Sequence, residues 1–407
     1  MIKNYYMRMK LYMRLIACIV ANPKYFIYVS SWADHDRISK QLKKGVVPRQ
    51  QSFFPTKLDL RITYRCNLRC KMCGQWGTTG TYEHYSADKR RVNLDIDSIS
   101  QVIEELLPKG LRFVDIEGGE TFLHPQVLDL FARLKNRNLV IKPVTNGTIL
   151  SSYAKEIVST GVDSIVVSID GDRETHNNIR GTSWAYDRTM EGIRSLREER
   201  RRQKKLLPFV QISYTMSRHN GAGALRRLVD ELSGEFLADL FVVKASPIFV
   251  PEYAGEAYRR LVEKYFGLTD GISAWEGFKG DYQDFAEEAE EIVSAIQDIQ
   301  RRVLPFYVAV LPRIDHREIP KLYLDYSWTL HRSHCPIPWV EPTIDSDGNV
   351  YPCNLFTDES LSMGSIHKQS FLEIWQGERY QQFRRMLIEQ RRGLIPICNR
   401  CCQFTER

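Results

Sequence analysis

Leu58-Asp59-Leu60-Arg61-Ile62-Thr63 is a strand-like run. Two residues separate it from Cys66-Asn67-Leu68-Arg69-Cys70-Lys71-Met72-Cys73, which contains three cysteines. Three thiolates this close together can hold three irons of a 4Fe-4S cluster, and because such a cluster has four irons, one iron has no protein ligand. An iron with an open coordination position can bind and reduce a ligand, whereas a fully ligated cluster only passes electrons. The stretch therefore predicts a reactive iron-sulfur cluster at the end of a strand.

A structural zinc site is the main alternative for these three cysteines. Such sites normally need four ligands and usually pair two CxxC-like elements, which this segment does not supply by itself. The chain has nine cysteines, an odd count for a secreted disulfide framework, and apart from Cys18 they cluster at 66–73 and 335–402. Clustered cysteines favour metal chemistry in a reducing compartment, so a cytoplasmic protein is expected. The length of 407 residues and the 43% hydrophobic content are those of an ordinary globular protein.

The formal charge of +7 comes partly from a basic run at 197–205, which is expected to be a solvated helix face. No aromatic-rich basic surface can be traced, so no nucleic-acid partner is expected. Residues 1–56 are predicted to be a basic, amphipathic extension that lies on the main domain or caps its site. Its apolar runs at 15–21 and 25–29 are too short to span a bilayer, and membrane-surface contact through residues 1–30 is the alternative. A signal peptide is not expected, since export would separate the protein from the machinery that builds iron-sulfur clusters.

Between residues 57 and 246, short strand-like runs alternate with longer helical patterns. Helical spacing is clearest at 96–107 and 126–134. Alternation of this kind predicts an α/β fold, a partial (β/α)6 TIM-like barrel with parallel strands inside and helices outside. In such barrels the chemistry lies at the C-terminal ends of the strands. The six predicted strands are 58–63, 112–116, 140–144, 164–169, 210–215 and 240–244.

Unusual residues follow three of these strands. Gly118-Gly119-Glu120 comes after the second strand, where two glycines let the backbone approach a ligand closely and a carboxylate can accept from an ammonium group. Thr145-Asn146-Gly147 follows the third strand and is also a common turn signal. The fourth strand ends in Ser168-Ile169-Asp170-Gly171, followed by His176 and Arg180. These positions predict a ligand site at the barrel mouth.

The cysteine spacing and these motifs together resemble the radical S-adenosylmethionine (SAM) superfamily. The resemblance implies that the open iron chelates SAM, and that reductive cleavage yields a 5′-deoxyadenosyl radical that takes a hydrogen atom from the substrate. The residues implied to bind SAM are Gly118, Gly119, Glu120, Asn146, Ser168 and Arg180. Glu120 would hold the amino group, and Arg180 would offer the SAM carboxylate a forked donor that lysine cannot reproduce. The alternative for Ser168 and Arg180 is a helix N-cap and a surface ion pair, and no catalytic residue is assigned.

A second cysteine group lies near the end of the chain. Twelve residues separate Cys335 from Gly348, four separate Gly348 from Cys353, and Cys398-Asn399-Arg400-Cys401-Cys402 follows. This order resembles the front half of the SPASM domain, with a hairpin turn at 344–348 and a helix at 371–375. The resemblance implies one auxiliary 4Fe-4S cluster held by Cys335, Cys353, Cys398 and Cys401, with Cys402 as the alternative to Cys401. Four thiolates leave no open iron, so this cluster would relay electrons or support the fold; zinc is a stronger alternative here than at the first site.

Four regions are therefore expected: the extension at 1–56, the barrel at 57–246, a connecting helical region at 247–330 and a small iron-sulfur domain at 331–407. The connecting region, with its acidic stretch at 281–291, is expected to cover the barrel mouth and to contact substrate. A solvated helix face explains the acidic residues equally well.

The resemblance leaves the reaction open. We expect a small-molecule or sugar-like substrate, with a dehydrogenase that uses the auxiliary cluster as an electron relay as one form of the reaction, and flavodoxin or ferredoxin as reductant. Peptide modification is the alternative, although no N-terminal segment resembles a leader-peptide recognition domain. Sulfatase-maturing relatives carry an aspartate that serves as a base at the position of Asn354, so this residue argues against that activity. An iron-sulfur electron-transfer or scaffold protein that binds no SAM is the alternative from another class.

Overall fold

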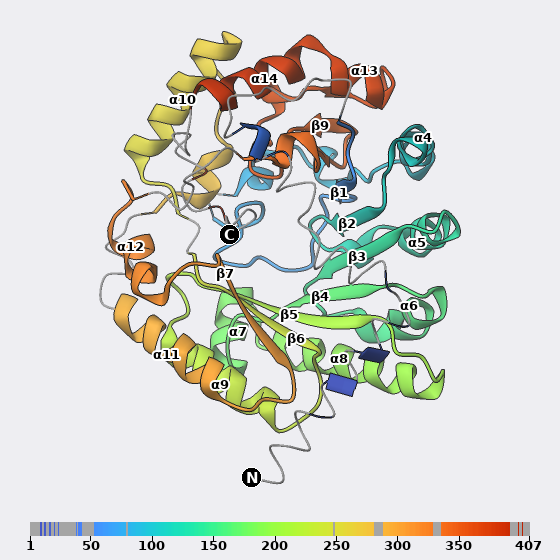
Figure 1. Cartoon of the computed structure of the whole chain (residues 1–407), viewed down its shortest axis with the longest axis vertical. Helices are drawn as coiled ribbons and strands as arrows, with labels where there is room; N and C mark the ends of the chain where they lie inside the picture. Colours follow the sequence, from blue (N-terminus) through green and yellow to red (C-terminus); the bar gives the residue numbers. More distant parts are fainter. Residues whose placement is uncertain are drawn as a thin grey trace.

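The computed structural model describes residues 53–78, 80–246, 249–280, 288–328 and 335–390, with Cys398, Cys401 and single positions between 9 and 42. Within this part, one ten-stranded sheet curves through the molecule and helices cover its outer side (Figure 1). The strands are β1 (Lys57–Arg61), β2 (Phe113–Glu117), β3 (Val140–Thr145), β4 (Ser164–Ser168), β5 (Phe209–Thr215), β6 (Leu240–Lys244), β7 (Tyr307–Leu311), β8 (Thr343–Ile344), β9 (Asn349–Tyr351) and β10 (Gly364–Ser365).

The sheet has the order β10-β9-β8-β1-β2-β3-β4-β5-β6-β7, and β1 to β7 pair in parallel with their neighbours. All six predicted strands are present and the partial barrel is confirmed. A seventh parallel strand, β7, adds to the edge of β6, within the region expected to be a helical connection. All five residues of β1 are buried, as expected for a strand covered on both faces.

The helices are α4 (Ile96–Leu106), α5 (Val127–Asn136), α6 (Ala154–Thr160), α7 (Arg173–Arg180), α8 (Ala185–Arg202), α9 (Ala222–Ser233), α10 (Glu252–Phe266), α11 (Ala289–Arg301), α12 (Ile319–Leu324), α13 (Phe371–Gln376) and α14 (Glu378–Glu389). Helix α4 shows why these segments form. Asp95 caps it by accepting from the Ser98 amide, and its apolar residues recur every three or four positions and are buried.

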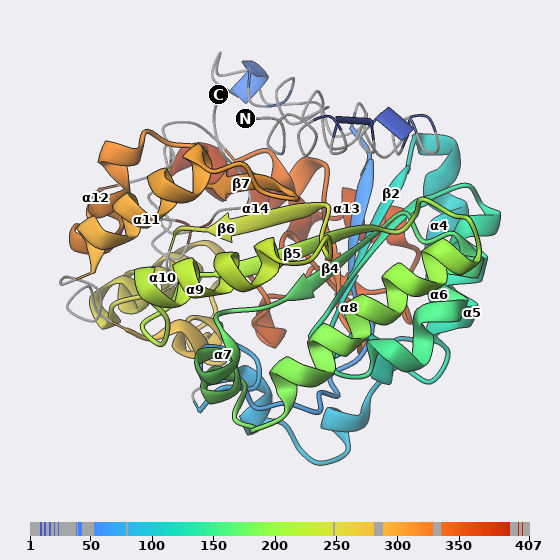
Figure 2. The same ribbon diagram turned by 90° about the horizontal axis from the view of Figure 1, so that it is seen from below.

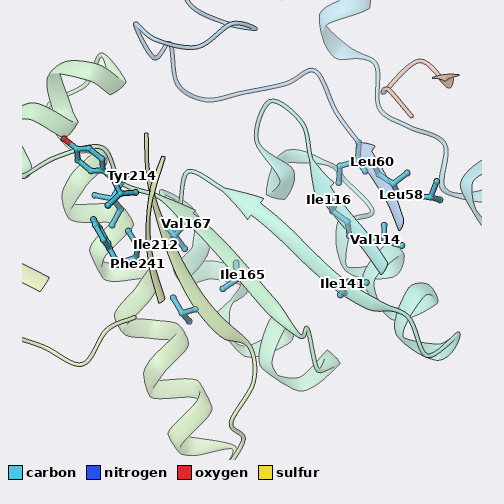
Figure 3. Packing of buried hydrophobic residues seen from close by; sticks show 14 of the residues in the cluster. Leu58, Leu60, Val114, Ile116, Ile141, Ile165, Val167, Ile212, Tyr214 and Phe241 are labelled. Carbon is cyan, nitrogen blue, oxygen red and sulfur yellow. The ribbon is translucent and has the colours of Figure 1, made fainter. Parts of the chain in front are cut away.

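The core lies between this helical layer and the strands. Figure 3 shows alternate residues of five strands pointing to the same side, among them Leu58, Leu60, Val114, Ile116, Ile141, Ile165, Val167 and Ile212.

The basic run at 197–205, at the end of α8, was expected to be a solvated helix face, and one of its residues is buried instead. Arg200 is buried and pairs with Asp239 at 3.0 Å, so this residue stabilises the barrel.

The C-terminal hairpin continues the barrel sheet. Strand β8 pairs in parallel with β1, so that Thr343 lies opposite Asp59, and β9 returns antiparallel after a turn in which Gly348 has a φ of +78°. The predicted hairpin turn and the helix at 371–375 are both present, and Ser370 and Glu373 form a capping box on α13. The division of the chain at residues 56, 246 and 330 stays a prediction.

Across the described residues, no helix has the length and apolar character that crossing a membrane would require.

Candidate active site at the barrel mouth

The loop that carries Cys66, Cys70 and Cys73 leaves the C-terminal end of β1 and is held by the residues that follow β2. The amide of Gly119 donates to the Thr63 carbonyl, and the amide of Glu120 donates to the Arg65 carbonyl, each at 2.7 Å. A methyl group on Gly119 would lie 2.2 Å from the Arg65 carbonyl oxygen. The glycines are therefore needed for close backbone packing against the cysteine loop. Their contact with SAM stays a prediction.

Each of the three cysteine sulfurs accepts a hydrogen bond from nearby N–H groups. The donors are the Leu68 amide to Cys66 (3.5 Å), the Trp76 amide to Cys73 (3.3 Å) and the Arg180 Nη1 to Cys70 (3.5 Å). Burial, together with the nearby charges of Glu120, Cys70 and Cys73, raises the pKa of the Cys66 thiol to about 12. Burial also raises the pKa of Cys70, against the opposing charge of Arg180. The fold thus brings the three predicted ligands together, and metal binding must displace their protons.

Arg180, at the end of α7, connects the cysteine loop to the end of β4. Its guanidinium forms a buried ion pair with Asp170 and donates to the Ser168 carbonyl at 3.2 Å, while its Nε has no hydrogen-bond partner. The surface ion pair considered from the sequence is therefore wrong, because the pair is buried. The N-cap alternative for Ser168 is also wrong, since the carboxylate of Asp172 caps α7. A role for Ser168 and Arg180 in SAM binding stays a prediction.

Glu120 joins the ends of β2 and β3. Its side chain is buried, and its carboxylate accepts from the Thr145 hydroxyl at 2.6 Å, the Asn146 amide at 2.7 Å and the Phe122 amide at 3.2 Å. Burial raises the pKa of Glu120, and these hydrogen bonds oppose the shift. A carboxylate has about four acceptor positions, so three internal partners leave room for one more donor. Contact between Glu120 and a SAM amino group stays a prediction.

Asn146 connects the turn after β3 to the cysteine loop. Its side-chain amide donates to the Asn67 side chain at 2.9 Å, and Asn67 donates to the Thr148 hydroxyl, also at 2.9 Å. Asn67 was not predicted to be a site residue, although it lies inside the cysteine motif. Asp170 was also missed as the partner of Arg180, although both lie in the segment after β4. Asn146 itself is where the sequence predicts it, at the mouth.

Aromatic side chains cover one side of the cysteine loop. Tyr64, Trp76 and Tyr82 are buried and pack against Cys66 and Cys73. The indole N–H of Trp76 donates to the Tyr64 carbonyl at 2.7 Å, and the Arg69 guanidinium lies 3.8 Å from the Trp76 ring centroid. This cluster, which the sequence did not reveal, keeps water from that side of the loop.

The segment between β6 and β7 packs against another side of the loop, and its expected role as a substrate cover stays a prediction. A 3-10 turn, η7 (Ala274–Phe278), packs there so tightly that a methyl group on Gly74 would lie 2.3 Å from the Phe278 ring. The same segment holds the C-terminal region, because Asp358 accepts from the Tyr258 hydroxyl at 2.9 Å and the Ser273 amide at 2.6 Å. The cover therefore contacts both cysteine-bearing regions. Most of the acidic stretch, residues 281–287, lies outside the described residues.

The four C-terminal cysteines also come together. Burial raises the pKa of Cys353 to about 11 and that of Cys335 to about 12. The pKa of Cys398 is raised by burial and by the charges of Cys353, Cys401 and Cys335, so the four groups lie near one another. Cys402 lies outside the described residues, and the choice between Cys401 and Cys402 stays a prediction.

The two cysteine groups lie at different levels along β1. Tyr351, two residues before Cys353, pairs with Thr343, which pairs with Asp59, the middle residue of β1. Cys66 comes five positions after Arg61, the last residue of β1. Arg61 links the groups through a 2.7 Å hydrogen bond to the carbonyl of Asn354. Two separate metal centres connected through β1 fit this arrangement.

Comparison with known proteins matches both regions. The family model of the Radical SAM superfamily matches residues 60–217, and that of the SPASM iron-sulfur cluster-binding domain matches residues 335–402. The chain belongs to the radical SAM superfamily. It is 26% identical to the AdoMet-dependent heme synthase of Methanosarcina barkeri, over 84% of this chain and 88% of the relative. It is 25% identical to the subtilosin biosynthesis protein AlbA of Bacillus subtilis, over 79% of this chain and 59% of the relative.

Solved radical SAM structures share the fold. Streptococcus suis SuiB bound to S-adenosylmethionine superposes with a TM-score of 0.57 at 16% identity, over 89% of this chain and 75% of SuiB. The anSMEcpe structure with bound AdoMet gives a TM-score of 0.54 at 15% identity, over 81% of this chain and 82% of that one. These likenesses support the partial barrel that the sheet order shows.

The radical SAM and SPASM domains imply a SAM-binding 4Fe-4S cluster and auxiliary iron-sulfur chemistry. Within the described ranges, no three His, Cys, Asp or Glu side chains are arranged to hold a single metal ion. In a 4Fe-4S cluster each thiolate binds a different iron, so the three cysteines need not converge on one metal position. Whether they fit a cluster is therefore judged from the groups around each sulfur. Cys66, Cys70 and Cys73 fit, because each sulfur already accepts an N–H of the kind that stabilises a cluster ligand. The superfamily is enzymatic, so the chain is placed among enzymes.

Proposed function

We propose that this radical SAM protein modifies a peptide. When bound, the cluster and SAM supply a 5′-deoxyadenosyl radical that removes a hydrogen atom from the substrate. The observation that carries the proposal is the likeness to AlbA over 79% of this chain, because the name of AlbA assigns it to the biosynthesis of a bacteriocin. SuiB, which shares the fold, was solved bound to the precursor peptide SuiA. These findings favour the peptide alternative over the sugar-like substrate that the sequence suggested.

The residues of this chain would hold and shield the reacting groups. Cys66, Cys70 and Cys73 provide the ligands, and Arg180 fixes Cys70 from the end of α7. The buried aromatic cluster beside Cys66 and Cys73 excludes water from that side of the loop and keeps the surroundings of the sulfurs apolar. Phe278 narrows the approach to the loop from the cover segment, and a peptide would lie against that segment.

A tetrapyrrole is the second candidate substrate. It is supported by the likeness to the heme synthase of Methanosarcina barkeri, which covers 84% of this chain and 88% of that enzyme. A porphyrin is a rigid, flat molecule, whereas a peptide is an extended chain. The two candidates would therefore need spaces of different shape beside the cover segment. Direct comparison of the two substrate classes therefore tests the proposal.

The test uses full-length protein reconstituted without oxygen and given SAM and dithionite. Precursor peptides encoded beside the gene are added to one set of reactions and iron coproporphyrin III to another. A peptide substrate predicts faster 5′-deoxyadenosine formation and a changed peptide mass, both lost in Cys70→Ser. A response to the porphyrin alone would overturn the peptide proposal and support the second candidate.

The auxiliary centre and the reductant complete the proposal. We infer that flavodoxin or ferredoxin delivers electrons, and that the four-cysteine centre either accepts an electron from the substrate radical or supports the fold. Cys353→Ser distinguishes these roles. If the centre is a relay, the variant still forms 5′-deoxyadenosine but releases little oxidised product, whereas a supporting role predicts a lower melting temperature and a parallel loss of both.

A further inference from the structure

Exposed apolar side chains gather at helical positions near the N-terminus and form a stripe. Of the eight large hydrophobic side chains exposed in the described part of the chain, five lie between residues 9 and 20. They are Met9, Tyr12, Met13, Ile16 and Val20, with exposed fractions of 47, 61, 59, 38 and 74%. Each of these five positions is helical, and a spacing of three and four residues is the one that gathers side chains on a common face of a helix. Such a concentration of exposed apolar side chains marks an interaction surface.

The charge around the stripe has one sign. Residues 1–33 contain no aspartate or glutamate, and the first carboxylate of the chain is Asp34. The same residues carry five basic side chains, Lys3, Arg8, Lys10, Arg14 and Lys24. An apolar helix face within a purely basic segment complements a surface that is both apolar and anionic.

The stripe lies at the end of the barrel opposite the cysteine loop. Tyr12 is close to Tyr307, the first residue of β7, whose pKa is raised by burial and by Tyr12. Because β1 and β7 belong to the same parallel series, the start of β7 and the end of β1 lie at opposite ends of the barrel. Figure 2 shows this separation, with dark blue N-terminal fragments at the top and the segments after β1 at the bottom.

We propose that the stripe formed by Met9, Tyr12, Met13, Ile16 and Val20 binds the surface of an anionic lipid bilayer. The apolar side chains enter the interface between headgroups and acyl chains, and the basic side chains contact the headgroups. A second copy of this chain is disfavoured as the occupant, because it would bring two purely basic segments together. A nucleic acid would match the charge and leave the apolar face unpaired.

The geometry has a consequence for substrate access. With the stripe on the bilayer, the barrel mouth and the cysteine loop face away from the lipid. The protein would therefore be held at the membrane while its site receives substrate and reductant from the aqueous side. This inference does not depend on which substrate class the site takes.

Vesicle flotation of the full-length, cluster-loaded protein tests the inference. We expect it to float with vesicles of phosphatidylcholine and phosphatidylglycerol, to bind pure phosphatidylcholine at least about tenfold less, and to lose binding at high salt. The double variant Ile16→Glu/Val20→Glu should bind the anionic vesicles at least about tenfold more weakly. Leu206→Glu, which changes an exposed apolar residue elsewhere, should bind like the unmodified protein. All variants should keep the same iron content and melting temperature.

Two flotation results would overturn the inference. One is full-length protein that does not float with anionic vesicles. The other is a double variant that binds them as well as Leu206→Glu does. Light scattering of the unmodified protein and of the double variant tests self-association. If the unmodified protein is a dimer and Ile16→Glu/Val20→Glu is a monomer, the stripe binds a second copy of the chain, and the lipid assignment is wrong.

Discussion

At the scale of single residues, the site depends on side chains that hold the cysteine loop as well as on the cysteines. Arg180 contacts the sulfur of Cys70, the carboxylate of Asp170 and the carbonyl of Ser168. The sequence identified Arg180 through its motif. It could not assign the ion pair with Asp170 or the contacts of Glu120 within the protein, because these depend on the distances between strand ends.

Arg180→Lys should weaken the first cluster. An ammonium group cannot reproduce three contacts in different directions, and removing a residue that orients a metal ligand costs ~10–100-fold in metal affinity. The measurement is iron retained per chain after timed exposure to a chelator. Arg173→Lys is the matched control, since Arg173 lies on the same helix in an exposed pair with Asp187. Equal iron loss from the two variants would contradict the role given to Arg180.

Gly119→Ala should destabilise the fold near the loop. The added methyl would meet the Arg65 carbonyl at 2.2 Å, and overpacking of this kind costs about 1–3 kcal/mol. Gly223→Ala is the control, because Gly223 is exposed within α9 and alanine there should stabilise the helix by about 0.5–1 kcal/mol. Chemical denaturation of cluster-free protein measures both. A Gly119→Ala variant as stable as the parent would contradict the close packing.

At the scale of elements, the sequence predicted the strands that form clear apolar runs and missed short or half-exposed ones. All six strands from β1 to β6 follow the pattern of buried parallel strands. Strand β7 is half-buried along its whole length and so has a weaker signal. Strands β8 and β10 have two residues each, too few for a periodic pattern, although the hairpin turn between β8 and β9 was recognisable. Their position beside β1 depends on long-range pairing that a local pattern does not encode.

The cover segment supplies a prediction at this scale. Phe278→Ala should expose the cysteine loop, because the ring packs against Gly74, next to Cys73. In cluster-free protein, alkylation of Cys73 followed by mass spectrometry should become several-fold faster. Phe266→Ala is the control, since Phe266 belongs to the same segment but packs against Phe383. If both variants accelerate the labelling of Cys73 equally, the effect is general loosening and the cover role of Phe278 is wrong.

At the scale of the whole molecule, one continuous sheet carries two cysteine groups at different levels of β1. The sequence predicted both groups and their order, because cysteine spacing is a local signal. It did not predict that the C-terminal hairpin would extend the barrel sheet.

Two clusters of four irons predict about eight irons per chain in the reconstituted protein, and about four in Cys335→Ser/Cys353→Ser. Iron and acid-labile sulfide assays check this count. About four irons together with one zinc in the unmodified protein would show that the second centre is a zinc site.

The central claim is that the three-cysteine loop cleaves SAM reductively. The most direct measurement is 5′-deoxyadenosine formed by anaerobically reconstituted protein with SAM and dithionite, quantified by liquid chromatography. The unmodified protein should form 5′-deoxyadenosine, and Cys70→Ser should form none above background. Protein with a spectroscopically intact cluster that forms no 5′-deoxyadenosine, with either candidate substrate class present, would contradict it.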